Sequence, residues 1–550
     1  MNLLSRFVPQ TEFSSYEDFC RNYKIQVPEK FNFAVDVVDA YAAMCPEKLA
    51  LRGVDDYGNA RDFTFGEISR LSRQAAFYLK SQGIEKGDRV ILILKRRWEY
   101  WVTAVALHRI GAVLIPASFQ LATKDIVYRA NVAGVKMILC ANDEWIVSQT
   151  EASLPKCTTV EKVGLVGAER DGWLPYGRMI EETKEQFIAD PDIQNSDIMI
   201  LYFTSGTTGM PKMVEHSFTY PLGHITTAKY WQVVEDDGLH LTVSDSGWAK
   251  FGWGCIYGQW ISGTAIMGYD MENKFNPAHL ITAIREKKPT TLCVPPTIYR
   301  YMMKEGFSRE DFSSIHHCST AGEPLSPEIS RTFTEMTGLT IHEGFGQTES
   351  PVLVANFPFF PHRAGSMGKP NPQFHIVILD ADGEECQIGA EGEMCIKDLE
   401  NGAPPTLIVG YRTEDGKQIP AHEGIYHTGD VVWRDEDGYL WFVGRNDDVI
   451  KCSGYRIGPF EIETILLGHP AVLECAITGA PDPLRGQVVK ATIVLNKGYT
   501  GSPELTKEIQ NYVKKATAPY KYPRIVEYVE ELPKTSSGKI SRVRIRANDQ

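Results

Sequence analysis

The strongest chemical signal is residues 204–212, TSGTTGMPK, a run of glycines and small hydroxyl residues that ends in a lysine. It follows residues 198–203 (IMILYF), an apolar run typical of a buried strand. Glycines let the backbone approach a ligand, hydroxyl and N–H groups can bind phosphate oxygens, and Lys212 adds positive charge. The spacing differs from that of a Walker A loop. The segment therefore predicts a phosphate-binding loop, with an ordinary surface loop as the alternative.

A second polar segment, residues 344–350 (GFGQTES), also follows a predicted strand. It offers the ring of Phe345, the amide of Gln347, the hydroxyl of Thr348 and the carboxylate of Glu349. Open α/β sheets bind ligands beyond the carboxyl ends of their strands, and a Mg²⁺ ion bound with a nucleotide needs few protein carboxylates. We therefore expect nucleotide and metal contacts here, with a polar loop of no special role as the alternative.

Two further segments are less specific when each is taken alone. Residues 426–430 (YHTGD) contain Asp430, whose two carboxylate oxygens could accept both hydroxyls of a ribose. Residues 533–539 (PKTSSGK) end in Lys539, a cation that could act on a phosphate. A common hairpin turn and a solvated lysine near the chain end are the respective alternatives.

The elements that must position these segments begin with an α/β alternation. Residues 33–79 predict helices that flank a short strand pair around residues 50–65. The pattern then predicts strands at 89–94, 113–115 and 136–140, with helices at 98–110 and 125–132 between them. Because the strands are almost continuously apolar, they favour a parallel sheet covered on both faces.

The alternation continues and then changes character. Further strands are predicted at 198–203, 291–294, 315–319 and 340–343, and a helix that has Ser326 as N-cap, Pro327 as first residue and Gly338 as its end. From residue 374 onward, short alternating strands with Asp-Gly turns predict antiparallel structure. The last 100 residues or so predict a small α+β unit, with a helix at 459–467, strands at 474–478 and 488–495, and a helix capped by Ser502.

Composition bounds the classes of protein that fit. A chain of 550 residues exceeds one ordinary core, so two or more domains are expected. The net charge of −13 argues against a broad nucleic-acid surface. Eleven unpatterned cysteines predict free thiols in a reducing compartment, without a disulfide framework or a zinc site. Since no membrane span or targeting segment is evident, we expect no integral membrane association and a cytoplasmic location.

Together, the chemical segments resemble one family. In order, YFTSGTTGMPK, GFGQTES, YHTGDVVWRDEDGYLWFVGRNDDVIKCSGYRIGPFEIE and PKTSSGKISR are similar to motifs of the adenylate-forming (AMP-binding) superfamily of acyl-CoA synthetases, nonribosomal adenylation domains and luciferases. The resemblance spans about residues 33–546, and SDSGWAKFGWGCIYGQW and STAGEPL look most like medium-chain acyl-CoA synthetases. It implies an α/β fold with a large N-terminal domain (1–446) of parallel-rich sheets flanked by helices plus a β-subdomain. A small mobile C-terminal α+β domain (447–550) would follow, with a hinge at Asp447.

The resemblance also implies roles for individual residues. The ATP-binding residues would be Thr204, Ser205, Gly206, Thr207, Thr208, Gly209, Lys212, Gly322, Glu323, Pro324, Phe345, Gln347, Asp430 and Arg445. In this set residues 204–212 would contact the β- and γ-phosphates, Phe345 would stack on adenine, and Asp430 and Arg445 would hold the ribose. The catalytic residues would be Thr348 at the α-phosphate, Arg456 facing the phosphates and Lys539 bridging the attacking carboxylate and the α-phosphate, while Glu349 would bind Mg²⁺.

Coenzyme A and the acid would use other positions. The resemblance places coenzyme A at Ser453, Gly454, Tyr455, Arg485, Lys521 and Arg524, and the acyl pocket at Trp248, Ala249, Lys250, Ala321 and Gly346. Acetate-specific relatives carry a tryptophan at the position of Gly346, so its absence predicts room beyond acetate. The alternative interpretation of Trp248 and Trp253 is that they are core aromatics. The alternative for Lys250 is that it faces solvent.

The implied activity is that of an ATP-dependent acyl-CoA synthetase that makes acyl-CoA, AMP and pyrophosphate from a medium-length or branched acid. The expected cofactors and substrates are ATP, Mg²⁺, coenzyme A and a small carboxylic acid, with no nucleic acid. An aryl-CoA ligase or an adenylation enzyme that loads a carrier-protein thiol is the runner-up. An inactive nucleotide-binding regulator is a third hypothesis, and the presence of Lys539, Glu349 and Asp430 argues against it.

Overall fold

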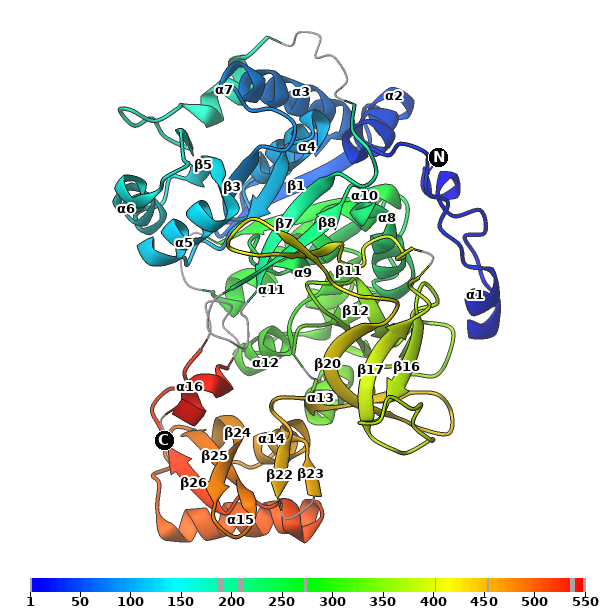
Figure 1. Cartoon of the computed structure of the whole chain (residues 1–550), viewed down its shortest axis with the longest axis vertical. Helices are drawn as coiled ribbons and strands as arrows, with labels where there is room; N and C mark the ends of the chain where they lie inside the picture. Colours follow the sequence, from blue (N-terminus) through cyan, green and yellow to red (C-terminus); the bar gives the residue numbers. More distant parts are fainter. Residues whose placement is uncertain are drawn as a thin grey trace.

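The computed structural model describes residues 2–184, 192–204, 211–271, 275–323, 325–400, 402–452, 455–534 and 540–547, with only the backbone of Arg456. Across these residues the fold is α/β, as the sequence predicts. Two large mixed sheets surrounded by helices are followed by a four-stranded antiparallel sheet and a C-terminal α+β unit. In Figure 1 the chain runs from the helix-rich upper part (blue and cyan) through the antiparallel sheet (yellow) to the C-terminal unit at the bottom (orange and red).

The first large sheet has a parallel centre made of consecutive apolar strands. Its eight strands are, in order, β19 (Gln418–Pro420), β18 (Gly410–Arg412), β8 (Lys212–Ser217), β7 (Ile198–Thr204), β4 (Val113–Pro116), β3 (Arg89–Ile93), β5 (Val135–Ala141) and β6 (Lys162–Val166). The strands from β7 to β6 are parallel, whereas β8, β18 and β19 add antiparallel pairs at one edge. Because residues 90–94 are buried on both faces, no polar/apolar alternation appears along β3.

The second large sheet also has strands whose ends reach the candidate site. Its nine strands are, in order, β15 (Lys369–Pro370), β14 (Val352–Ala355), β13 (Ile341–Gly346), β12 (His317–Thr320), β11 (Thr291–Cys293), β9 (Leu239–Thr242), β10 (Ala265–Asp270), β1 (Leu49–Asp55) and β2 (Ala60–Thr64). The central strands run parallel, so β12 and β13 end at the same edge of the sheet.

Helices cover the sheets, and the helices predicted at 98–110, 125–132 and 459–467 lie at or close to those bounds. The helices are α1 (Tyr16–Asn22), α2 (Ala40–Met44), α3 (Phe65–Ser81), α4 (Trp98–Ile110), α5 (Thr123–Ala133), α6 (Glu144–Ser153), α7 (Tyr176–Glu182), α8 (Tyr220–Ile225), α9 (Ala249–Gly254), α10 (Tyr257–Ile261), α11 (Pro277–Lys287), α12 (Pro296–Glu305), α13 (Pro327–Thr337), α14 (Pro459–Leu467), α15 (Pro503–Ala516) and α16 (Arg542–Ala547). Shorter turns are the 3₁₀ segments Leu4–Arg6, Leu154–Lys156, Arg309–Phe312 and Pro519–Lys521 and the π segments Ala34–Asp39 and Thr226–Trp231. Ser326 does stand at the N-cap of α13, but its side chain makes no capping hydrogen bond. No helix of the described ranges is long and apolar enough to cross a membrane.

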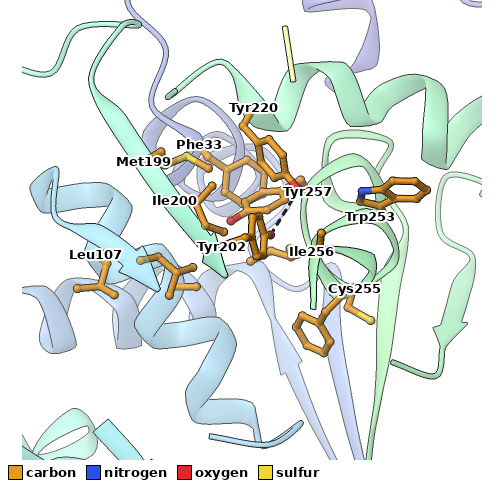
Figure 2. Close-up of a cluster of buried hydrophobic side chains, with 14 of the residues drawn as sticks. Phe33, Leu107, Met199, Ile200, Tyr202, Tyr220, Trp253, Cys255, Ile256 and Tyr257 are labelled. Carbon is orange, nitrogen blue, oxygen red and sulfur yellow. Dashed lines mark hydrogen bonds between the residues drawn. The ribbon is translucent and has the colours of Figure 1, made fainter. Parts of the chain in front are cut away.

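An aromatic cluster fills the core between the two large sheets (Figure 2). Tyr202 on β7, Tyr220 on α8 and Tyr257 on α10 point toward one another, and the Tyr220 hydroxyl donates to that of Tyr202 at 3.4 Å. Trp253 on α9 lies to one side of these tyrosines. The short helices α8, α9 and α10 are therefore held by core packing, because isolated helices of this length are unstable in water.

Two smaller sheets complete the fold. The antiparallel sheet contains β16 (His375–Leu379), β17 (Gly392–Lys397), β20 (Tyr426–Arg434) and β21 (Leu440–Arg445). The C-terminal sheet contains β23 (Tyr455–Ile457), β22 (Ile450–Cys452), β25 (Gly486–Leu495), β24 (Val472–Asp482) and β26 (Ile525–Tyr528), and α14 and α15 pack against it. The antiparallel prediction from residue 374 onward is confirmed.

Candidate active site

A cleft of about 1330 Å³ lies where the strand ends of both large sheets meet the antiparallel sheet and the C-terminal unit. It brings together most of the predicted nucleotide residues that the structure describes. These lining residues are Thr204, Lys212, Gly322, Glu323, Phe345, Gln347, Thr348, Glu349, Asp430 and Arg445. They come from β7, β8, the end of β12, β13, β20 and β21, so the chain folds four distant segments onto one cavity.

A polar network organises one wall of this cleft. The Gln347 amide donates to a carboxylate oxygen of Asp430 at 2.5 Å and to the Thr428 carbonyl at 2.7 Å, and it accepts from the Tyr426 hydroxyl at 2.9 Å. The Arg445 guanidinium reaches both Asp430 oxygens at 3.3 and 3.4 Å. Each side chain is thereby held in one orientation before any ligand binds.

Asp430 is both buried and charged in this network. Burial raises the pKa of its carboxyl to about 6, and the positive charge of Arg445 opposes the shift. At neutral pH the group is therefore ionised, with both oxygens available as acceptors. A carboxylate so placed can bind a diol, which matches the role expected of Asp430.

Glu349 provides an acidic centre next to this wall. Its carboxylate accepts from the Tyr411 hydroxyl at 3.1 Å, and its charge together with burial raises the pKa of Tyr411. The Lys212 ammonium lies over the Tyr411 ring at 5.4 Å from its centroid. A carboxylate oriented by a tyrosine hydroxyl, beside a lysine at the strand end, fits a site for a hard cation bound together with phosphates.

Two of the predicted acyl-pocket residues, Trp248 and Gly346, line the cleft. Ala249, Lys250 and Ala321 are absent from its lining. Lys250 is half-buried and donates to the Ala321 carbonyl at 2.8 Å, so it does not simply face solvent.

Gly346 does not leave an empty space. A Cβ at this residue would lie 2.2 Å from the Pro351 carbonyl oxygen and 2.4 Å from the tip of the Trp253 indole. Trp253 is 5% exposed, and its indole N–H has no partner within the described part of the chain. The indole therefore takes the volume that a side chain at Gly346 would claim. Gly346 itself lines the cleft, whereas Trp253 is not among the lining residues.

The C-terminal unit presents one particular face to the cleft. Residues 534 and 540–544 line the cavity, together with Phe460 of α14 and Arg546 of α16. Arg546 and Arg542 pair with Asp448 at 2.6 and 3.5 Å, and Arg542 also bonds the Glu463 carboxylate at 2.7 Å. Asp447 lines the cleft as well, 3.9 Å from the Arg445 guanidinium.

The predicted coenzyme A residues lie elsewhere on this unit. Tyr455 stacks on Tyr520 with ring centroids 4.2 Å apart, Lys521 pairs with Glu461 at 2.5 Å, and Arg524 donates to the Tyr522 hydroxyl at 2.9 Å. These residues and the exposed Arg485 are absent from the cavity lining. The cleft thus faces the segment on both sides of Lys539, not the predicted thiol-side residues.

Several predicted positions lie outside the described residues. They are Ser205, Gly206, Thr207, Thr208, Gly209, Pro324, Ser453, Gly454 and Lys539, together with the side chain of Arg456. Thr204 and Lys212, at the two ends of the glycine-rich segment, are paired across the antiparallel strands β7 and β8.

Sequence reasoning missed some residues that shape the cleft. Tyr411 comes from a strand with no recognisable motif, and only its contact with Glu349 reveals it. Tyr426 opens the YHTGD segment, and its position beside Asp430 was the available signal. Arg542 is the last residue of the PKTSSGKISR motif and Arg546 lies just beyond it, and the sequence predicted no role for either.

Comparison with known proteins identifies the family. The family model "AMP-binding enzyme" matches residues 38–401, and "AMP-binding enzyme C-terminal domain" matches residues 461–539. The chain belongs to the AMP-binding enzyme family. It is 39% identical to acyl-coenzyme A synthetase ACSM3, mitochondrial, of Mus musculus, over 98% of this chain and 94% of that protein. It is 37% identical to acyl-coenzyme A synthetase ACSM5, mitochondrial, of Homo sapiens, with the same coverage.

Solved structures give the same fold. The anthranilate CoA ligase AuaEII in complex with anthranoyl-AMP superposes with a TM-score of 0.84 at 26% identity, covering 95% of this chain and 98% of that one. The Brucella canis acyl-CoA synthetase superposes with a TM-score of 0.73 at 30% identity, covering 98% and 99%. The chain is therefore an AMP-forming acid–thiol ligase, an acyl-CoA synthetase that uses ATP.

Proposed function

We propose that this acyl-CoA synthetase acts on a medium-length or branched carboxylic acid through an acyl-adenylate. The observation that carries the proposal is that one cleft is lined both by the polar groups around Asp430 and by Trp248 and Gly346. We assign the latter two residues to an apolar wall for the acyl chain. An adenylate has these two halves, a nucleotide and an acyl chain. The relatives named ACSM3 and ACSM5 support the acyl-CoA chemistry, and the apolar wall supports an aliphatic acid.

The first half-reaction joins the acid to the nucleotide. A carboxylate oxygen bonds to the α-phosphorus of ATP, and pyrophosphate leaves with the electron pair of the broken P–O bond. Charge accumulates around the α-phosphate, so fixed cations there lower the barrier. We assign Lys539, Arg456 and the Thr348 hydroxyl to that position, and the glycine-rich segment at residues 204–212 to the departing phosphates.

The nucleotide itself would be held by the preorganised wall. Asp430 and Arg445 bind the ribose, Phe345 stacks on adenine, and Gly322 and Glu323 border the base. Glu349 would hold Mg²⁺, which supplies charge neutralisation on the phosphates when bound. Tyr411 supports this assignment because its hydroxyl fixes the Glu349 carboxylate at 3.1 Å.

The second half-reaction would transfer the acyl group to coenzyme A. The thiol sulfur bonds to the acyl carbon, and AMP leaves as the carbon–oxygen bond breaks. In the described arrangement the residues that flank Lys539 face the cleft, while Tyr455, Arg485, Lys521 and Arg524 do not. We therefore propose that residues 447–550 rotate about Asp447 between the half-reactions and then present these four residues.

The acyl pocket sets the expected substrate range. The Trp253 indole fills the space beside Gly346, and we propose that this side chain of α9 sets the depth of the acyl pocket. An apolar wall of this kind favours aliphatic carbons, and its depth limits their number. An aryl acid is the second candidate, because the similar AuaEII structure is that of an anthranilate CoA ligase.

The deciding experiment is an acid panel assayed for pyrophosphate and AMP release with ATP and coenzyme A. We expect the highest kcat/KM with acids of medium length or with branches, and little activity with acetate. Production of ADP and phosphate would contradict the adenylate route, and a preference for aryl acids would select the second candidate. Adenylate release without coenzyme A turnover would point to a carrier-protein thiol.

The cytoplasmic location remains a prediction, and fractionation of tagged protein decides between it and the mitochondrial location given in the names of the relatives.

A further inference from the structure

A cluster of potential metal ligands lies on the antiparallel sheet, outside the proposed catalytic groups. Glu393 and Cys395 belong to β17 and His427 to β20, and one ligand atom from each lies within 4.8 Å of the other two. Cys395 is buried, Glu393 half-buried and His427 exposed. A thiol, an imidazole and a carboxylate thus lie close together, and the imidazole is exposed to solvent.

The strand pairing explains why these three residues converge. Cys395 is the direct cross-strand partner of His427, and Glu393, two residues earlier, shares the face of Cys395. The register shifts between them, since Glu393 pairs with Val431, and the extra residues bulge from β20. Gly429 in this bulge has φ +72°, a conformation that glycine adopts readily.

The distances among the three ligand atoms are close to those expected around one metal ion. The Cys395 sulfur is 3.4 Å from the His427 Nδ1, and the same Nδ1 is 3.1 Å from a Glu393 oxygen. With metal–sulfur, metal–nitrogen and metal–oxygen bonds of about 2.0–2.3 Å, tetrahedral geometry separates ligand atoms by roughly 3.3–3.6 Å. Small side-chain adjustments therefore suffice to place one ion at bonding distance from all three atoms.

We propose that Glu393, Cys395 and His427 form a binding site for a zinc-class divalent cation. Sulfur and imidazole ligands favour such borderline-soft ions over Mg²⁺ or Ca²⁺, which prefer oxygen ligands. With three protein ligands, the fourth position would be taken by water, reached from the exposed side of His427. This site is separate from the one assigned to Mg²⁺ at Glu349, and it does not depend on the acyl substrate.

The site adjoins the nucleotide wall through Glu393. One oxygen of this carboxylate accepts the Gly429 N–H at 2.9 Å, while the other faces His427. Gly429 immediately precedes Asp430, and Glu393 and His427 both border the cleft. The hydrogen bond from the Gly429 N–H orients Glu393 in the way that outer hydrogen bonds commonly orient metal ligands.

Cysteine spacing could not reveal this cluster. The cysteines occur singly, without a CxxC pair, so the sequence predicts no zinc site. Here the ligands come from two strands, and their approach depends on pairing register. A bulge at Gly429 is not visible in a spacing pattern.

The test titrates chelator-treated full-length protein with Co²⁺ and then displaces it with Zn²⁺. We expect one equivalent of Co²⁺ to give the intense thiolate-to-cobalt charge-transfer band and the visible absorption of a tetrahedral ion. The variant Cys395→Ser should lose the charge-transfer band. The variants His427→Asn and Glu393→Gln should bind at least about tenfold more weakly, because even outer-sphere losses cost that much.

Matched controls are available on β16 and in the connection between β16 and β17. Cys386→Ser removes a half-buried thiol that contacts the Glu391 carbonyl, and His375→Asn removes a histidine paired with Asp398. Both should bind Co²⁺ like the parent. His427 is exposed, so its variant should stay folded even if Cys395→Ser is destabilised, and thermal unfolding of each variant checks this. The absence of a charge-transfer band in the parent, or undiminished binding by Cys395→Ser and His427→Asn, would overturn the proposal.

Discussion

The two walls of the cleft are built on different physical principles. The proposed nucleotide wall consists of polar groups fixed by hydrogen bonds, with Gln347, Asp430 and Arg445 in one network. The proposed acyl wall is shaped by close packing, as where the Trp253 indole lies against Gly346. The first wall specifies a ligand through directed contacts, and the second does so through volume.

This difference determines how each wall should respond to change. Removing a directed, charge-assisted contact leaves its buried partner unpaired, which is costly and specific to the nucleotide. Changing a packed volume alters the number of carbons that fit, at a modest free energy per carbon. Perturbation of the nucleotide wall should therefore change rate and ATP affinity, and perturbation of the acyl wall should change preference among acids.

The largest expected effect is that of Lys539→Ala. Loss of one cation at the developing charge should lower adenylate formation by roughly 10²–10³. Thioester formation from supplied acyl-adenylate should be retained, because the segment around Lys539 would have moved away. The two rates are measured by pyrophosphate release and by acyl-CoA production. Equal losses in both half-reactions would contradict the proposed domain rotation.

Asp430→Ala should come next, because it removes an acceptor from the nucleotide wall. Hydrogen bonds to charged groups contribute about 1.5–3 kcal/mol, so the KM for ATP should rise about 10- to 150-fold. The acid preference should stay unchanged. Asp435→Ala is the matched control, since Asp435 lies on the same hairpin but pairs with Arg363. A change in acid preference with no change in KM for ATP would break the division between the walls.

Acid should weaken nucleotide binding through Asp430. The pKa of its carboxyl is raised to about 6, so protonation below that pH removes an acceptor, and affinity should fall about tenfold per pH unit. Adenosine is the appropriate ligand, because it carries no phosphates that titrate in this range. Asp430→Asn should bind adenosine weakly and with no such pH dependence. A slope unchanged in Asp430→Asn would assign the titration to another group.

The same pKa has an opposite consequence for the unliganded protein. Because the folded-state pKa lies above the ordinary value near 3.8, the protonated form is favoured by folding. That contribution is complete below about pH 3.8 and is lost as the pH rises through about 6. Above that range, Asp430→Asn should therefore be at least as stable to heat as the parent, even though it binds nucleotide less well.

The smallest effect per step is expected at the acyl wall. Replacing Trp253 by Phe, Leu and then Ala should extend the range toward longer acids, with about a fourfold gain in kcat/KM per methylene newly accommodated. The KM for ATP should stay the same across the series. Trp253→Ala removes a large buried side chain and should cost about 3–5 kcal/mol of stability, so unfolding is measured in parallel. A folded series with one unchanged chain-length profile would show that the indole does not bound the acyl pocket.

The sequence predicted the nucleotide wall far better than the acyl wall. Helices 98–110 and 459–467 were predicted at the bounds the structure has, because periodicity and flanking prolines or glycines define them locally. Asp430 and Gln347 stand in motifs that resemble those of the family, and this resemblance rather than the single residue types gave them their predicted roles. Trp253 could not be placed in this way, since the contact of its indole with Gly346 depends on how α9 packs against β13. Tyr411 was missed for the same reason.

The ion pairs of Asp448 have a mechanical consequence. Arg542 and Arg546 tie the last described helix to the residue directly after Asp447, and Arg542 also holds Glu463. These ion pairs therefore link the first and last described parts of the C-terminal unit at Asp448, beside the proposed pivot. A rotation at Asp447 would therefore carry α16 together with Asp448 and Glu463. A change of backbone angle at the proposed pivot would then move the face that α16 presents to the cleft.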